Sequence, residues 1–187
     1  MALESGKLIL GIDPGTTVMG FSVLEVKGSA LHLVQYGVLK LSRQPNHAVK
    51  LRKIFDQTQA IIDQYLPDEM AIEAQFFGKN VQSMLKLGRA QGVAIAAALS
   101  RDIPFVEYAP KKVKQSVTGN GNASKEQVAR MVAQLLHISD SPALFDATDA
   151  LSVALCHHYQ TSNGMPNYGK SPNSWGSFLN NNPHRIK

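Results

Sequence analysis

The sequence lacks the features that mark secreted and membrane-inserted proteins. Its 187 residues include a single cysteine, Cys156, so no disulfide can form within the chain. No stretch approaches 18 apolar residues, so no membrane span is expected. The first residues show no basic segment followed by a long apolar one, which is the pattern of a signal peptide. These absences predict a cytoplasmic protein with no membrane partner.

Acidic residues are missing from the last part of the chain. Residues 161–187 contain Lys170, Arg185 and Lys187 and no acid, so they carry +3 of the formal net charge of +5. The other 160 residues are close to neutral, and net charge therefore favours a nucleic-acid partner only weakly. Asn, Ser, Gly and Pro dominate after Gln160. We expect residues 1–160 to form one domain and residues 161–187 a flexible basic tail.

Hydrophobic periodicity predicts an alternation of strands and helices. The expected strands are residues 7–12, 20–26, 31–41, 69–73 and 103–108. The expected helices are residues 47–66, 80–100, 110–117, 124–137 and 145–159. Ser124 and Gln127 fit a capping box, Gly28 a hairpin turn and Gly37 a bulge. Three strands in a meander followed by βα units indicate an α/β fold with a mixed five-stranded sheet flanked by helices.

Four carboxylates stand at positions where a metal site would form. Asp13 and Glu73 each end an apolar strand, and their side chains would meet if the two strands are parallel neighbours. Asp146 and Asp149 are three residues apart on the last expected helix and therefore share one face. Charges next to a core need compensation, and a hard divalent cation such as Mg²⁺ prefers carboxylate oxygens.

Each carboxylate also has an ordinary explanation when it is taken alone. Asp146 suits the start of a helix, Glu73 could be a solvated strand end, and Asp13 could cap a turn with the Pro and Gly that follow it. The Asp-x-Gly-Thr pattern of residues 13–16 also resembles the phosphate loop of sugar-kinase, chaperone and actin-type ATPases. Those folds need two such domains, for which 187 residues are too few. The residues alone leave these alternatives open.

Several spaced segments together resemble the RuvC family of bacterial Holliday-junction resolvases. In chain order they are Gly11-Ile12-Asp13-Pro14-Gly15, Ala71-Ile72-Glu73 with Phe76, Lys86-Leu87-Gly88-Arg89-Ala90 with Gly92, Glu107-Tyr108-Ala109-Pro110 with Lys114, Gly119 and Gly121 before Ala123-Ser124-Lys125, and Asp146-Ala147-Thr148-Asp149-Ala150-Leu151. The match runs along nearly all of residues 7–160 and excludes residues 161–187. The resemblance implies an RNase H-like fold and a homodimer that nicks two opposed strands of a four-way DNA junction in recombination and repair.

The resemblance also assigns roles to the four acids. It implies that Asp13, Glu73, Asp146 and Asp149 are catalytic and hold two Mg²⁺ ions per subunit, with Mn²⁺ able to substitute. In-line hydrolysis would leave 5′-phosphate and 3′-hydroxyl ends. The branch-migration proteins RuvA and RuvB are implied as partners.

Basic and aromatic residues supply candidate DNA contacts. Lys114 and Lys125 match family positions that serve DNA binding, and Lys125 also catalysis. Phe76 matches a loop aromatic that stacks on an unpaired base, although it could instead pack in the core. Lys86 and Arg89 are candidates for contacts with the phosphate backbone, although most surface cations of this kind only meet solvent.

Two other functions compete with junction resolution. One is a related RNase H-like nuclease that acts on another nucleic acid, such as pre-16S rRNA, and the other is a DNA-binding relative without activity. The Lys114, Lys125 and Phe76 pattern favours the resolvase, and the presence of all four acids disfavours an inactive relative. The histidines His137, His157 and His158 form no nucleophilic triad or zinc motif, so we assign them structural roles.

Overall fold

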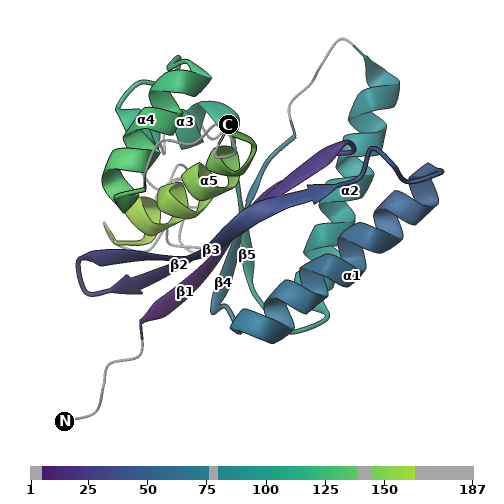
Figure 1. Ribbon diagram of the computed structural model, residues 1–187, viewed down its shortest axis with the longest axis horizontal. Helices are drawn as coiled ribbons and strands as arrows, with labels where there is room; N and C mark the ends of the chain where they lie inside the picture. The colour runs from purple at the N-terminus through teal and green to yellow at the C-terminus, as the bar shows by residue number, and fades with distance from the viewer. Residues whose placement is uncertain (1–5, 76–79, 139–144, 163–187) are drawn as a thin grey trace, which may run out of the picture.

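The computed structural model describes residues 6–75, 80–138 and 145–162 (Figure 1). The strands are β1 Lys7–Asp13, β2 Val18–Lys27, β3 Ala30–Lys40, β4 Glu69–Glu73 and β5 Phe105–Tyr108. The helices are α1 His47–Tyr65, α2 Val81–Leu99, α3 Pro110–Thr118, α4 Lys125–Leu136 and α5 Phe145–Ser162. Every expected element is present in the expected order. Three ends differ by two to three residues: β2 starts at Val18, β5 starts after Pro104, and α5 continues to Ser162.

One mixed sheet organises the molecule. Its strand order is β3-β2-β1-β4-β5, with β1–β2 and β2–β3 antiparallel and β1–β4 and β4–β5 parallel. This confirms the predicted meander followed by parallel strands. Gly11 pairs with Ala71 and Ile12 with Ile72. The last residues of β1 and β4 therefore lie next to each other at the same edge of the sheet.

Alternating side chains of the strands supply two hydrophobic cores. On one face, Ile9, Leu24 and Ala71 pack against α3, α4 and α5. On the other face, Leu10, Ile12, Val23, Met70 and Ile72 pack against α1 and α2. Figure 1 shows α1 and α2 side by side on one side of the sheet, with α5 on the other. Both faces are therefore covered, which explains the almost continuous apolar runs of β1 and β4.

Local signals set several ends of these elements. The predicted capping box of α4 is present, with reciprocal hydrogen bonds between Ser124 and Gln127. Gly28 has a φ of 58° in the two-residue turn between β2 and β3, as predicted for this hairpin. The predicted bulge at Gly37 is wrong, because Gly37 pairs regularly with Phe21 and the register shift occurs between Val23 and Leu24. Gly37 makes room for the Phe21 ring, which a Cβ would approach to 3.0 Å.

Membrane insertion has no support in the helices that the structure describes. None of them combines the length and the apolar character that crossing a bilayer requires.

Candidate active site

Asp13 and Glu73 lie side by side where β1 and β4 end. Ile12 pairs with Ile72, and Asp13 and Glu73 are the next residues of the two strands. Side chains alternate along a strand, so Asp13 points to the same face as Gly11, and Glu73 to the same face as Ala71. That is the face covered by α5. The prediction that parallel strands bring these two carboxylates together is therefore confirmed.

A close contact between α5 and the sheet positions the third carboxylate. A Cβ on Gly11 would lie 2.3 Å from the Ala150 carbonyl oxygen and 2.6 Å from Ser22 Oγ. Ser22 pairs with Gly11 across β1 and β2, and its hydroxyl donates a 2.9 Å hydrogen bond to the same carbonyl. The absence of a side chain at Gly11 thus lets α5 pack closely against β1, and the Ser22 hydrogen bond fixes the helix there. Asp149, the residue before Ala150, is brought to the edge where Asp13 and Glu73 lie.

The three carboxylates form one electrostatic centre. Burial raises the pKa of Asp13 to about 6, the negative charge of Asp149 adds to this rise, and Lys125 opposes it. Burial raises the pKa of Glu73 to about 8, and Asp13 and Asp149 add to this rise. The charge of Asp149 therefore makes ionisation of Asp13 and Glu73 less favourable, and the charge of Asp13 does the same for Glu73. A bound cation would remove that penalty, so this donor set of hard oxygens fits a divalent metal such as Mg²⁺.

Lys125 and Lys114 bring positive charge to the same centre. Lys125, the first residue of α4, places Nζ 2.8 Å from Asp149 Oδ2, and this hydrogen bond raises the Lys125 pKa. The Lys125 side chain is nevertheless 72% exposed and accessible to a ligand. Lys114 Nζ donates to the Ala123 carbonyl at 2.9 Å, and its charge partly opposes the rise in the pKa of Glu73. Both predicted DNA-contacting lysines therefore lie beside the carboxylates.

Two of the predicted site residues lie wholly or partly outside the described residues. Asp146 belongs to the first turn of α5, but its side chain is not among those described, and neither is any part of Phe76. Within the described part of the chain, no three acidic, histidine or cysteine side chains converge closely enough to hold one ion. Asp146 is the natural candidate to complete the set, because it precedes Asp149 by three residues on the same helix.

Lys86 and Arg89 are not part of this centre. Both are exposed on α2, which covers the opposite face of the sheet. Their charges instead act on His47 at the start of α1.

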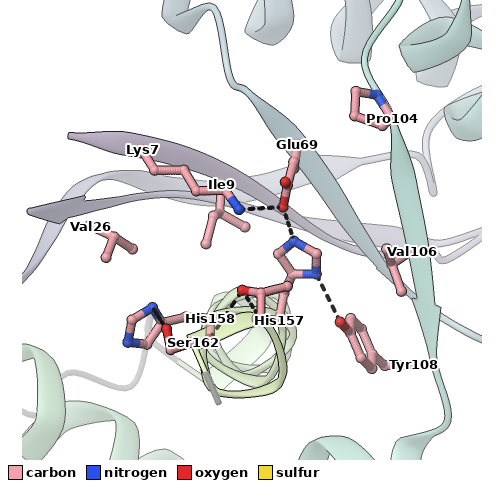
Figure 2. A pocket seen from close by; sticks show the side chains of 11 residues that line it. Lys7, Ile9, Val26, Glu69, Pro104, Val106, Tyr108, His157, His158 and Ser162 are labelled. Carbon is pink, nitrogen blue, oxygen red and sulfur yellow. Dashed lines mark hydrogen bonds and ion pairs between the residues drawn. The ribbon is translucent and has the colours of Figure 1, made fainter. Parts of the chain in front are cut away.

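A cavity of about 370 Å³ lies at the far edge of the sheet, where β1 and β4 begin (Figure 2). Glu69 accepts hydrogen bonds there from Lys7 and from buried His157, and Tyr108 is 2.8 Å from His157 Nδ1. Burial alone would raise the pKa of Glu69, but the Lys7 and His157 hydrogen bonds outweigh it and lower that pKa. These contacts anchor the last turns of α5, which fits the structural role predicted for His157.

The residues that position the carboxylates were not predicted from the sequence. Ser22 is a buried polar residue within the apolar run of β2. A serine in such a run is visible in the sequence and could have indicated a specific hydrogen bond. Its partner is a backbone carbonyl 128 positions later, and no local pattern indicates that pairing. Gln91 is similar: it is buried on α2, donates to Glu107 at 3.2 Å, and lies 3.5 Å from the Glu73 carbonyl oxygen.

Comparison with known proteins identifies the family. The model of the family described as "Crossover junction endodeoxyribonuclease RuvC" matches residues 9–157. The chain belongs to the RuvC family. A RuvC protein of Cytophaga hutchinsonii is 57% identical over 181 residues, which cover 97% of this chain and 88% of the relative. A RuvC protein of Bacteroides fragilis is 56% identical over 183 residues, covering 97% and 96%.

Solved RuvC structures confirm the RNase H-like fold. The structure titled "T. thermophilus RuvC in complex with Holliday junction substrate" is 33% identical, has a TM-score of 0.79, and covers 84% of this chain and 96% of its own. The yeast mitochondrial resolvase Ydc2, at 16% identity and a TM-score of 0.58, shares the fold alone. These RuvC relatives lend no support to the alternative that the chain processes pre-16S rRNA.

Proposed function

We propose that this chain is a crossover junction endodeoxyribonuclease that resolves Holliday junctions in recombination and DNA repair. It would do so by paired, symmetric cuts that leave 5′-phosphate and 3′-hydroxyl ends. One observation carries the proposal beyond family membership. Asp13, Glu73 and Asp149 share an electrostatic centre with Lys125 at the carboxyl edge of a parallel strand pair, where such sheets place their sites.

The carboxylates are proposed to hold the metal. Asp13, Glu73 and Asp149, together with Asp146, would bind two Mg²⁺ ions per subunit, and Mn²⁺ would substitute. A divalent pair of this kind supplies activation of the attacking water and stabilisation of the leaving 3′-oxygen. Support comes from the raised pKa values of Asp13 and Glu73, since burial, and then the neighbouring acids, make their charged forms unfavourable without a cation.

The chain's own cations are proposed to orient the DNA. Lys125 holds Asp149 with one N–H and has two further donors for a phosphate oxygen. Lys114 is fixed by the Ala123 carbonyl and would contact a neighbouring phosphate. Phe76, three residues after the end of β4 in the sequence, is proposed to stack on a base at the crossover. Lys86 and Arg89 are proposed to contact backbone phosphates away from the scissile bond.

A homodimer is proposed because α2 exposes an apolar face. Val81, Leu85 and Leu99 are 62%, 50% and 53% exposed and recur at helical spacing. A Cβ on Gly88 or Gly92, on the same face, would meet nothing within 4 Å. Apolar and small residues of this kind favour close packing against a second helix. A two-fold pair of active sites would match the symmetry of the junction.

Other parts of the assignment rest on the family resemblance or on the composition of the sequence. RuvA and RuvB are proposed as partners and the cytoplasm as the location. Residues 1–160 are proposed to form the nuclease domain and residues 161–187 a separate basic tail. The alignment with the Cytophaga hutchinsonii RuvC spans 97% of this chain, so it includes most of that tail.

The proposed function is tested with a labelled mobile four-way junction and a linear duplex of the same sequence. We expect paired nicks in the junction when Mg²⁺ is present, no nicks with EDTA, and no cutting of the duplex. Equal cutting of both DNAs, or cutting of a structured RNA alone, would contradict the assignment.

The variant Asp13→Asn tests the role of the carboxylate centre. It keeps the shape of the side chain but removes one metal-binding charge, so we expect cleavage to fall by about a thousand-fold or more. Junction binding, measured by fluorescence anisotropy, should not weaken, because Asp13 contributes negative charge that repels phosphates. A variant that still cleaves at the original rate would remove Asp13 from the site.

A further inference from the structure

A second group of basic residues lies across the sheet from α5. His47 is the first residue of α1 and Lys50 follows one turn later, while Lys86 and Arg89 are exposed on the first half of α2. Figure 1 shows the two helices side by side. Burial lowers the pKa of His47, and the charges of Arg89, Lys86 and Lys50 lower it further, so the three cations lie around His47. We name these four residues the α1–α2 basic cluster.

The cluster adjoins the catalytic edge of the sheet. Lys50 Nζ donates a 2.8 Å hydrogen bond to the carbonyl of Thr16, three residues beyond Asp13. The Leu41 N–H donates to the carbonyl of neighbouring Thr17 at 2.8 Å, which ties the approach to α1 to the same connection. Lys50 is therefore held in place next to the loop that follows the first catalytic carboxylate.

The cluster lacks the compensation that other cations of the molecule have. Arg52 pairs with Asp56 and Arg101 with Asp63, but among the described residues none of the four cluster members forms an ion pair with an acid. The first turns of α1 and α2 also contain no acid. His47 Nε2 is buried without a hydrogen-bond partner among the described atoms. The lowered pKa keeps His47 neutral near neutral pH, so the charge of the cluster comes from Lys50, Lys86 and Arg89. Three uncompensated cations on two adjacent helices suit a polyanionic ligand.

We propose that the α1–α2 basic cluster binds the phosphate backbone of a second duplex arm of the junction. The proposal rests on the proposed function and extends it. At a crossover each cut strand leaves one arm and enters another, so duplex flanks the scissile phosphate on both sides. Lys114 and Lys125 flank the carboxylates on the α5 face, and the cluster flanks them on the opposite face.

Lys50 is the strongest contact within this surface. One of its three donors is used by Thr16, which leaves two for phosphate oxygens. Because that bond already restricts the side chain, binding costs less conformational entropy than it would for a free surface lysine. Arg89, on the facing helix, has a guanidinium that can bind a phosphate through two N–H groups and adds a second contact.

The test measures junction affinity against salt concentration in protein that carries Asp13→Asn and so leaves the DNA intact. We expect Lys50→Ala and the pair Lys86→Ala with Arg89→Ala each to weaken binding about three- to ten-fold. The slope of log affinity against log salt should become shallower by about 0.9 for each phosphate that the variant no longer neutralises. Arg52→Ala, which removes an α1 cation already paired with Asp56, is the matched control and should leave affinity and slope nearly unchanged.

Lys50→Arg separates a phosphate contact from support of the Thr16 loop. Arginine keeps the charge, so the wild-type slope should be retained. If Lys50→Ala lowers affinity but leaves the slope unchanged, or if neither changes, the inference is wrong while the nuclease assignment stands. If the protein without substitutions fails to bind or cut the junction, the proposed function is wrong instead. Mass measurement of each variant excludes loss of the dimer as the cause.

Discussion

At the scale of single residues, the crowded carboxylates make the metal-free protein sensitive to pH. Asp13 and Glu73 have folded-state pKa values of about 6 and about 8, raised mainly by burial, whereas in the unfolded chain they return to 3.8 and 4.5. Between these limits the folded state binds more protons than the unfolded state. These two groups therefore make stability fall as the pH rises from about 4 to about 8. His47, His157 and His158 act in the opposite direction below their ordinary pKa of 6.5, because burial lowers their pKa values.

We therefore expect the melting temperature in EDTA to drop as the pH rises from about 6.5 to about 8. The carboxylates contribute a loss of unfolding free energy on the order of a few kcal/mol. Mg²⁺ should restore more stability at pH 8 than at pH 5, because the acids must ionise to bind it. Glu73→Gln removes the group with the larger shift, so it should flatten the profile. A profile in EDTA that rises with pH and is the same in Glu73→Gln would contradict the interpretation of these carboxylates.

The sequence predicted some of these residues better than others, for a physical reason. Asp13 and Glu73 were predictable because each ends an apolar strand, and parallel strands meet at their carboxyl ends. Ser22 was not, because its role depends on a carbonyl that only folding brings near. His47 and Lys50 carry no pattern that distinguishes them from solvated cations, and only the packing of α1 beside α2 reveals their neighbours.

At the scale of elements, the close packing of α5 against β1 at Gly11 controls the geometry of the site. Gly11→Ala would place a methyl group 2.3 Å from the Ala150 carbonyl, so the helix must shift. We expect a loss of roughly 1–3 kcal/mol in unfolding free energy, or about 2–4 °C in melting temperature per kcal/mol. Cleavage should fall further than stability, because Asp149 moves with the helix.

Ser152→Ala is the matched control for this variant. Ser152 is also a buried residue of α5, but its hydroxyl bonds to the Thr148 carbonyl within the helix rather than to the sheet. It should lower stability without a comparable loss of cleavage. Full activity in folded Gly11→Ala protein would show that the packing of α5 against β1 does not set the position of Asp149.

Basic residues at helix starts oppose the stability of the helices that carry them. The first turn of α3 contains Lys111 and Lys112 and no acid, although the positive end of a helix dipole favours acids there. Lys111→Glu should therefore stabilise the fold by about 0.3–1 kcal/mol. It should also weaken junction binding, because α3 carries Lys114 beside the carboxylates.

Thermal melting and junction anisotropy measure the two effects of Lys111→Glu separately. Lys27→Glu makes the same charge change at the hairpin end of β2, where Lys27 pairs with Glu25. That control should lose stability and keep its junction affinity. Equal loss of affinity in both variants would mean that net charge, and not the place of Lys111, governs binding.

Caps and turns were predictable from the sequence where all interacting residues are close in sequence. They were not predictable where a residue from another strand determines the local structure. The Ser124–Gln127 capping box and the Gly28 turn were readable because all their partners lie within four residues. The bulge was misplaced because a glycine in a strand can either disturb pairing or admit a neighbour. At Gly37 the neighbour is the Phe21 ring, which belongs to another strand.

At the scale of the whole molecule, the topology gathers positive charge around one edge of the sheet. β1, β3 and β4 all end there, so α1 and α2 begin beside that edge, and the start of α4 reaches it through Lys125. Dipole ends and lysines therefore surround the carboxylates, although the chain outside residues 161–187 is nearly neutral. This explains why overall charge predicted a nucleic-acid ligand poorly.

The exposed apolar face of α2 is the proposed dimer contact, and a single substitution can test it. Leu85 is 50% exposed, so Leu85→Asp should leave the subunit folded while placing a charge in the proposed dimer contact. Light scattering should then report the monomer mass, against a dimer for the unchanged protein. Val49→Asp, at an exposed apolar position of α1, is the control and should stay dimeric.

On a cruciform plasmid, coupled cuts in opposed strands give linear product, whereas single uncoupled cuts give nicked circles. Leu85→Asp should shift the product toward nicked circles, and a variant that stays dimeric and gives linear product would place the dimer contact elsewhere.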